Sequence, residues 1–147
     1  KCNMTDIMAA IGLVQLQRYD SLLQKRRNII RRYDEMCNEL GVMHLNHYTE
    51  SSSSSGHLYL TRVPGISDEQ RRDIIIKLAE MGVSTNVHYK PLPMMSAYKK
   101  MGWDIKDFPN AYAYYENLIT LPLHTKLSDE MVEYVIKCFK KVIKEYI

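Results

Sequence analysis

The first forty residues carry a helical repeat that is longer than the helices of most globular domains. Apolar residues recur at helical spacing throughout residues 5–40, Thr5 is a suitable N-cap, and Gly41 is a suitable stop. We expect either one long bent helix or a break near residues 19–21. Such a helix has more apolar surface than a small sheet can cover, so part of it should meet a partner outside the small domain.

The remainder of the chain alternates between strand-like and helix-like segments. Two helices are expected to begin at the N-caps Ser67 and Ser128, the first of them with the capping box Ser67–Gln70. The segments with strand character are residues 57–63, 83–89 and 119–124. This order predicts an α+β fold, in which a small sheet of about three strands is covered by helices on one face.

The expected organisation has two parts. Residues 1–40 form a long interdomain or dimer-interface helix region, and residues 41–147 form a small α+β domain. Five consecutive serines at 51–55 cannot pack into a core, so we expect residues 49–56 to be a mobile loop. Because the chain begins KCNMTD, without an initiator methionine, we expect it to be the remainder of a longer protein.

The segment 82–93, GVSTNVHYKPLP, raises a question about function. Its alternation places Val83, Val87 and Tyr89 on one face, toward the helices, and Asn86 and His88 on the other. In an isolated domain, Asn86 and His88 would belong to a solvated sheet face. The alternative is that they line a cleft against a second domain, where the two prolines that follow would hold a rigid loop. The pattern alone leaves both interpretations open.

Composition excludes several classes of protein. The three cysteines, Cys2, Cys37 and Cys138, are odd in number and widely spaced, which argues against a disulfide framework and favours a reducing cytoplasm. No apolar run approaches the ~18 residues that would span a bilayer. The net charge of +3 is mild and neither demands nor excludes an anionic partner. We expect neither a membrane nor a nucleic acid as partner.

Two clusters have both a functional and an ordinary interpretation. His44 and His47 lack further ligands at metal-binding spacing, so we expect loop histidines and no metal site. The basic residues of segment 25–32 could contact phosphate on a sugar nucleotide or a nucleic acid, but they are more simply the solvated side of a helix.

Four blocks of the chain resemble one enzyme family. Residues 1–16, KCNMTDIMAAIGLVQL, are similar to the segment N-Y-R-M-T-D-I-Q-A-A-I-G-L-x-Q-L of the DegT/DnrJ/StrS family, with departures at Cys2 and Met8. The family's other segments resemble GHLYLTRV (56–63), GVSTNVHYKPLPMMSAYKKMG (82–102) and DFPNAYAYYENLITLPLHTKLSDEMVEYVI (107–136). The four blocks follow the family's order from residue 1 to residue 136, and residues 41–55 lie outside the resemblance.

The resemblance implies the C-terminal part of a fold-type I aminotransferase that uses pyridoxal 5'-phosphate. Members of this family transfer an amino group, usually from glutamate, to a nucleotide-linked keto sugar for polysaccharide or glycoconjugate biosynthesis, and they act as homodimers. Their Schiff-base lysine lies in the large N-terminal domain. We therefore expect no catalytic residue in this chain, no bound cofactor and no activity from the chain alone.

The resemblance also implies roles for four residues. The segment before the long helix reaches the partner's cofactor phosphate in the family, which makes Lys1 and Asn3 the expected cofactor-binding residues. The histidine of the V-H-Y motif faces the active-site cleft, which makes His88, with Asn86 on the same face, the expected substrate-binding residues.

Two alternatives to the aminotransferase remain. Some members of the family dehydrate the sugar, with a histidine replacing the lysine. The position that carries this lysine or histidine is not among these residues. A protein of another class, a non-catalytic domain that dimerises through the helix and binds anions through its basic faces, would also fit the charge pattern.

Overall fold

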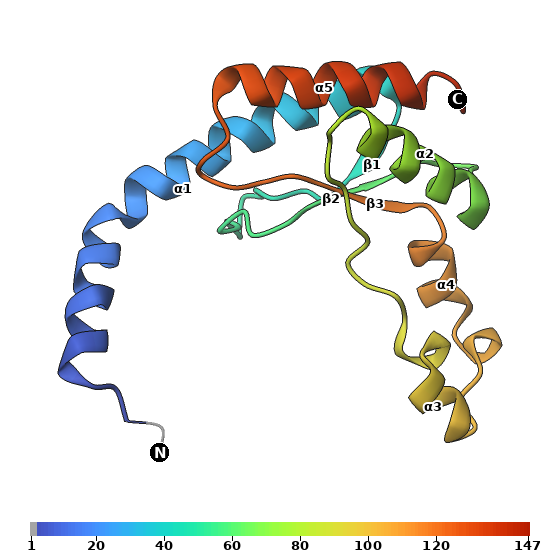
Figure 1. The fold of residues 1–147 in the computed structure, drawn as a ribbon, viewed down its shortest axis with the longest axis horizontal. Helices are drawn as coiled ribbons and strands as arrows, with labels where there is room; N and C mark the ends of the chain where they lie inside the picture. The colour runs from blue at the N-terminus through green and yellow to red at the C-terminus, as the bar shows by residue number, and fades with distance from the viewer. Residues whose placement is uncertain (1–2) are drawn as a thin grey trace.

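The computed structural model describes residues 3–147. Its first element is a single helix, α1 (Asp6–Leu40), which begins at the N-cap Thr5 and ends at Gly41. Gly41 adopts φ +68°, the left-handed conformation that glycine reaches without a steric penalty. Of the two sequence expectations, the continuous helix is therefore correct, and Figure 1 shows it curving along its length.

The sheet has three antiparallel strands. They are β1 (Met43–His44), β2 (Tyr59–Arg62) and β3 (Leu118–Leu121), in the order β1-β2-β3. Tyr59 pairs with Leu121 and Arg62 pairs with Leu118 across the central contact. The α+β class and the number of strands were predicted, and so were β2 and β3.

The strand expected at residues 83–89 does not form, which is a correction to the sequence interpretation. In this segment only Asn86 pairs with β3, through two backbone hydrogen bonds to Thr120 of 3.1 and 2.7 Å. In that register the next hydrogen-bonded pair would join Ser84 to Pro122, which has no N–H to donate. The remaining strand of the sheet is β1, in a region where no strand was expected.

Three helices cover one face of the sheet. The second half of α1, α2 (Asp68–Glu80) and α5 (Asp129–Ile143) lie together on that side (Figure 1). Ser67 forms the expected capping box with Gln70 at the start of α2. The core contains a T-shaped pair of Tyr33 and Tyr59 with ring centroids 5.0 Å apart. The largest fully buried side chains are Tyr33, Tyr59, Phe139, Ile30, Met36, Ile74, Leu78, Leu118, Ile119, Leu121, Ile143 and Val63.

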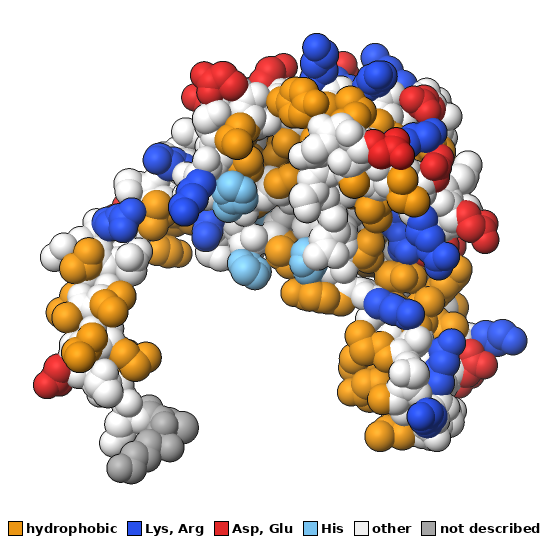
Figure 2. Space-filling view, viewed as in Figure 1, with side chains coloured by type: hydrophobic (Ala, Val, Ile, Leu, Met, Phe, Trp, Pro, Cys, Tyr) orange, Lys and Arg blue, Asp and Glu red, His pale blue; other side chains and the backbone are white. Residues whose placement is uncertain are grey.

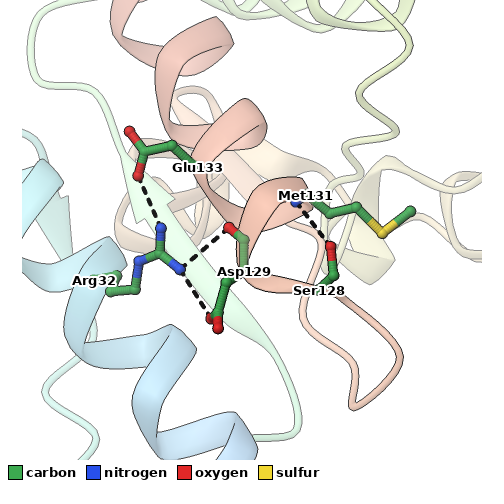
Figure 3. Close-up of polar contacts among 5 residues, drawn as sticks. All are labelled: Arg32, Ser128, Asp129, Met131 and Glu133. Atoms are coloured by element: carbon green, nitrogen blue, oxygen red, sulfur yellow. Dashed lines mark hydrogen bonds and ion pairs between the residues drawn. The ribbon is translucent and has the colours of Figure 1, made fainter.

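A polar clamp joins α1 to the start of α5 (Figure 3). Arg32 lies 3.3 Å from Asp129 and 2.8 Å from Glu133. The Ser128 hydroxyl accepts a hydrogen bond of 3.2 Å from the backbone N–H of Met131 and so caps α5. These contacts connect the second half of α1 to the first turns of α5.

Two arms extend from the same side of this body (Figure 1). One is the first half of α1. The other is the segment between Tyr89 and β3, with the short helices η1 (Leu92–Met94), α3 (Ser96–Lys100), η2 (Ile105–Asp107) and α4 (Pro109–Tyr115). Figure 2 shows hydrophobic side chains along both arms and histidines on the underside of the body between them. Large apolar side chains are therefore exposed on both arms.

Candidate functional site: a polar cleft beside the third strand

Thr120 holds the segment that contains Asn86 and His88. Its backbone pairs with Asn86, and its hydroxyl lies 3.0 Å from Nδ1 of His88. Thr120 itself is buried on β3. Because Nδ1 is engaged with the hydroxyl, Nε2 is the ring nitrogen that can meet a ligand.

These residues line a cleft of about 170 Å³. Its wall consists of His57, Leu58, Ser84, Asn86, His88, Thr120, Leu121, Pro122 and Leu123. Imidazole, amide and hydroxyl groups donate and accept hydrogen bonds without a fixed charge, a chemistry suited to the hydroxyls of a sugar. No carboxylate or lysine is among the lining residues.

The orientation predicted for the polar residues agrees with the structure, and that of one apolar residue does not. Asn86 is exposed and His88 is half-buried, so helices of this chain do not cover them. Val83 is buried at 2% exposure, as expected, whereas Tyr89 is 69% exposed. The strand geometry that would have turned Tyr89 inward is absent beyond Asn86.

Sequence reasoning missed three lining residues of this cleft. Thr120 was assigned only to a strand, and its partnership with His88 depends on the antiparallel crossing of two distant segments. His57 and Ser84 reach the same cleft from the residues before β2 and after α2. Two signals were usable: Ser84 alternates with Asn86 and His88 along the sequence, and His57 opens the strand expected at 57–63.

Of the two residues expected to bind cofactor, the structure describes only Asn3. Lys1 lies outside the described residues. Asn3 is exposed and precedes the N-cap Thr5, at the end of the α1 arm that points away from the sheet (Figure 1). The structure therefore does not bring Asn3 to the cleft of this same chain.

His44 and His47 pack against Tyr59 on the opposite edge of the sheet. Their rings stack on the tyrosine ring with centroid distances of 6.3 and 5.6 Å. His47 lies in a loop, as expected, but it is buried there, and burial lowers its pKa; His44 instead belongs to strand β1. Within residues 3–147 no group of three or more His, Cys, Asp or Glu side chains is placed to hold a metal ion.

The polar groups around Tyr59 form a closed network. The Tyr59 hydroxyl donates a 2.7 Å hydrogen bond to Asp34 and contacts the Cys37 thiol at 3.7 Å. Burial raises the pKa of Tyr59 and raises that of Cys37 to about 12. A thiol with so high a pKa is inert as a nucleophile, so this network serves packing.

No helix within residues 3–147 is long and apolar enough to cross a membrane.

Comparisons with known proteins agree on one family. The model of the DegT/DnrJ/EryC1/StrS aminotransferase family matches residues 1–140. The Bacillus subtilis spore coat polysaccharide biosynthesis protein SpsC is 32% identical over 98% of this chain and 38% of its own length. A UDP-4-amino-4,6-dideoxy-N-acetyl-beta-L-altrosamine transaminase from Campylobacter jejuni is 28% identical over 97% of this chain and 39% of its own length.

A solved structure shows the same fold. The PLP-form of Spr1654 from Streptococcus pneumoniae superimposes with a TM-score of 0.93 at 56% identity, over 100% of this chain and 38% of that one. The chain thus spans less than half the length of the relatives it matches. It belongs to the DegT/DnrJ/EryC1/StrS aminotransferase family, and its fold is that of one part of a fold-type I aminotransferase.

Proposed function

We propose that this chain forms the substrate-side wall of an aminotransferase that acts on a nucleotide-linked keto sugar. The observation that carries the proposal is the cleft beside β3, where the V-H-Y histidine of a matched family block points outward from a polar wall. The Campylobacter jejuni relative, named as a transaminase of a UDP-linked amino sugar, supports this substrate class. The name of SpsC supports a role in polysaccharide biosynthesis.

The cleft residues would bind and orient the sugar. His88 Nε2 and the Asn86 amide would hydrogen-bond its oxygen atoms, and the Thr120 hydroxyl would fix the ring orientation of His88. Asn86 and His88 are therefore our proposed substrate-binding residues. We propose no catalytic residue on this chain.

The described residues do not by themselves form a site for pyridoxal phosphate. The cleft has no lysine among its lining residues, and Asn3 precedes the N-cap of α1. Structures of Spr1654 are described as PLP- and PMP-forms, and the cofactor, when bound, supplies an electron sink. We therefore place Lys1 and Asn3 toward the cofactor phosphate of a second subunit in a homodimer, with glutamate as amino donor, and the Schiff-base lysine outside these residues.

Replacement of His88 tests the proposal in the complete protein. His88→Ala should lower kcat/KM for the keto sugar at least ~10-fold, since it removes a hydrogen bond made to the substrate. The melting temperature should change little, because the side chain is only half-buried. His124→Ala is the matched control, because His124 is exposed and is not among the cleft residues. Parallel losses of stability and activity in His88→Ala would make His88 structural and contradict the proposal.

Thr120 gives a second, independent readout. Thr120→Val removes the hydroxyl that orients His88, whereas Thr120→Ser retains it. Thr120→Val should therefore raise the KM for the keto sugar, whereas Thr120→Ser should keep the KM of the unmodified protein. Steady-state kinetics with varied keto sugar concentration measures both values. Equal KM values for the two variants would show that the hydroxyl does not position His88.

The chain alone should show no transaminase turnover and no bound cofactor, since the proposal places the lysine elsewhere. Absorbance spectroscopy with added pyridoxal phosphate checks this expectation, and turnover by the isolated polypeptide would contradict it.

A further inference from the structure

A second pocket lies on α1, away from the polar cleft. We call it the Arg27 pocket; it has a volume of about 240 Å³ and is lined by Gln24, Arg27, Arg31, Asp34 and Tyr48. The α1 members recur at intervals of three and four residues, so they share one face of the helix. Tyr48 closes the pocket from the segment that follows β1. The basic residues of segment 25–32 are therefore not all on a simple solvated face.

The serine-rich loop folds onto this pocket. Ser53 pairs with Tyr48 in an isolated bridge, and its hydroxyl accepts a 3.3 Å hydrogen bond from Nη2 of Arg27. Gly56 brings the loop against α1, where a Cβ atom would lie 2.8 Å from Cδ1 of Ile30. The loop thus adds a hydroxyl to the rim of the pocket.

Donor groups at the pocket are left without protein partners. Nε of Arg27 and the hydroxyl of Tyr48 are buried and make no hydrogen bond to any described residue. Arg27 lies over the Tyr48 ring at 5.8 Å from its centroid. A buried donor without a partner costs stability, and a ligand at this pocket that accepts hydrogen bonds would offset that cost.

The charge at the pocket favours an anion. Arg27 and Arg31 present two guanidinium groups one helical turn apart. The one carboxylate, Asp34, is already engaged, since its Oδ1 accepts from the Tyr59 hydroxyl at 2.7 Å and lies 3.1 Å from Nδ1 of His44. Its Oδ1 therefore faces the Tyr59 network, and the two guanidinium groups outnumber this one carboxylate in the lining of the pocket.

We infer that the Arg27 pocket binds a diphosphate group. The guanidinium groups of Arg27 and Arg31 and the hydroxyls of Tyr48 and Ser53 offer donors from two segments of the chain, which suits the many oxygens of a phosphoryl chain better than the two of a carboxylate. The Gln24 amide already donates to Oδ1 of Asn28 at 3.0 Å, and one nitrogen of Arg31 donates to the same oxygen at 3.3 Å. The residues from Ser53 at this pocket to His57 at the polar cleft can span at most roughly 14 Å. This distance is short enough for one ligand to place a diphosphate in the Arg27 pocket and a sugar in the polar cleft. A nucleotide-linked sugar is therefore one candidate ligand, and this candidate rests on the proposed function. Free pyrophosphate is the other candidate.

Calorimetric titration of the complete protein with inorganic pyrophosphate at low salt tests the pocket. Arg27→Gln should weaken binding at least ~10-fold, because a charge-assisted hydrogen bond is lost. Lys141→Gln is the control, since it removes the same charge from an exposed position on α5. Absence of pyrophosphate binding to the unmodified protein, or equal affinities of the two variants, would overturn the inference.

Tyr48→Phe separates binding from folding. The hydroxyl has no partner among the described residues, so its removal should leave the melting temperature unchanged or raise it, while pyrophosphate binding weakens about threefold or more. Unchanged affinity in this variant would contradict the inference even if Arg27→Gln failed to fold.

Competition identifies the source of the diphosphate. If UDP displaces pyrophosphate, the pocket binds a nucleotide ligand. If UDP does not displace bound pyrophosphate, the pocket binds free diphosphate. Glutamate that binds at this pocket when pyrophosphate does not would overturn the inference. These titrations need no turnover, so their failure is distinguishable from a failure of the proposed aminotransferase activity.

Discussion

The two halves of α1 have the same secondary structure and opposite surroundings. In the first half, Ile7 and Leu16 are 76% and 69% exposed, whereas Ile30 and Tyr33 in the second half are fully buried. Helices in proteins owe most of their stability to packing rather than to intrinsic propensity. The second half is therefore part of this domain, while the first half is an apolar arm that the rest of an aminotransferase would cover under the proposed function.

Truncation of one large apolar side chain in each half should give the largest contrast. Ile30→Ala should lower the free energy of unfolding by about 2–5 kcal/mol, since it leaves a cavity in the core. Ile11→Ala, at a side chain that is 59% exposed, should stay within about 0.5 kcal/mol in the 147-residue chain. Urea denaturation measures both, and equal losses would show that the first half is also packed.

The two glycines near these halves should respond with opposite signs. Gly56→Ala should destabilise the chain by about 2 kcal/mol, because φ is +64° and the new Cβ would meet Ile30. Gly12→Ala should stabilise helix α1 by about 0.5–1 kcal/mol, since nothing lies within 4 Å of a Cβ there. Thermal unfolding followed by circular dichroism checks both, and a destabilising Gly12→Ala would contradict the exposed arm.

A fall in pH should lower the free energy of unfolding of the chain, because His47 in the packed half takes up a proton more readily when the chain is unfolded. Burial lowers the pKa of His47 in the folded chain, with Asp34 opposing and His44 reinforcing that shift. The unfolded chain therefore takes up the proton first, so stability present above pH ~6.5 is lost as pH falls toward the lower folded pKa. Unfolding free energies measured from pH 7.5 to 5 should show a shallower slope in His47→Phe, and an unchanged slope would exclude His47 as the cause.

The Arg32 clamp should contribute least. Arg32→Gln breaks contacts to Asp129 and Glu133, whose side chains are 97% and 69% exposed. Exposed ion pairs are worth about 0–1 kcal/mol and are screened by salt. The difference from the unmodified chain should therefore shrink between low and high salt in urea denaturation, and a loss that does not depend on salt would indicate packing by the arginine stem instead.

Local signals predicted much of the fold. The N-cap Thr5, the Gly41 stop and the Ser67–Gln70 capping box each depend on residues a few positions apart, and each forms as expected. The family blocks located His88 and Asn86, and the structure leaves both uncovered by this chain's helices.

The errors and omissions arise from contacts between distant segments. The pairing of segment 83–89 does not extend from Asn86 to Ser84 because Pro122 lies opposite, and β1 depends on the pairing of Met43 with Arg62. Thr120 and the Arg27 pocket likewise depend on partners far away in the sequence. Alternation and helical period cannot report such pairings, since they describe one segment at a time.

The most direct test of whether the chain is one part of a larger closed site is amide hydrogen exchange along α1. The exchange rates are compared between the 147-residue chain and the complete protein. In the chain alone, amides 10–20 should exchange about 100-fold faster or more than those of residues 29–37, because no packing supports them. In the complete protein the same amides should become protected, together with those of residues 84–88 beside the cleft. Amides 10–20 that exchange as rapidly in the complete protein as in the isolated chain would contradict the account.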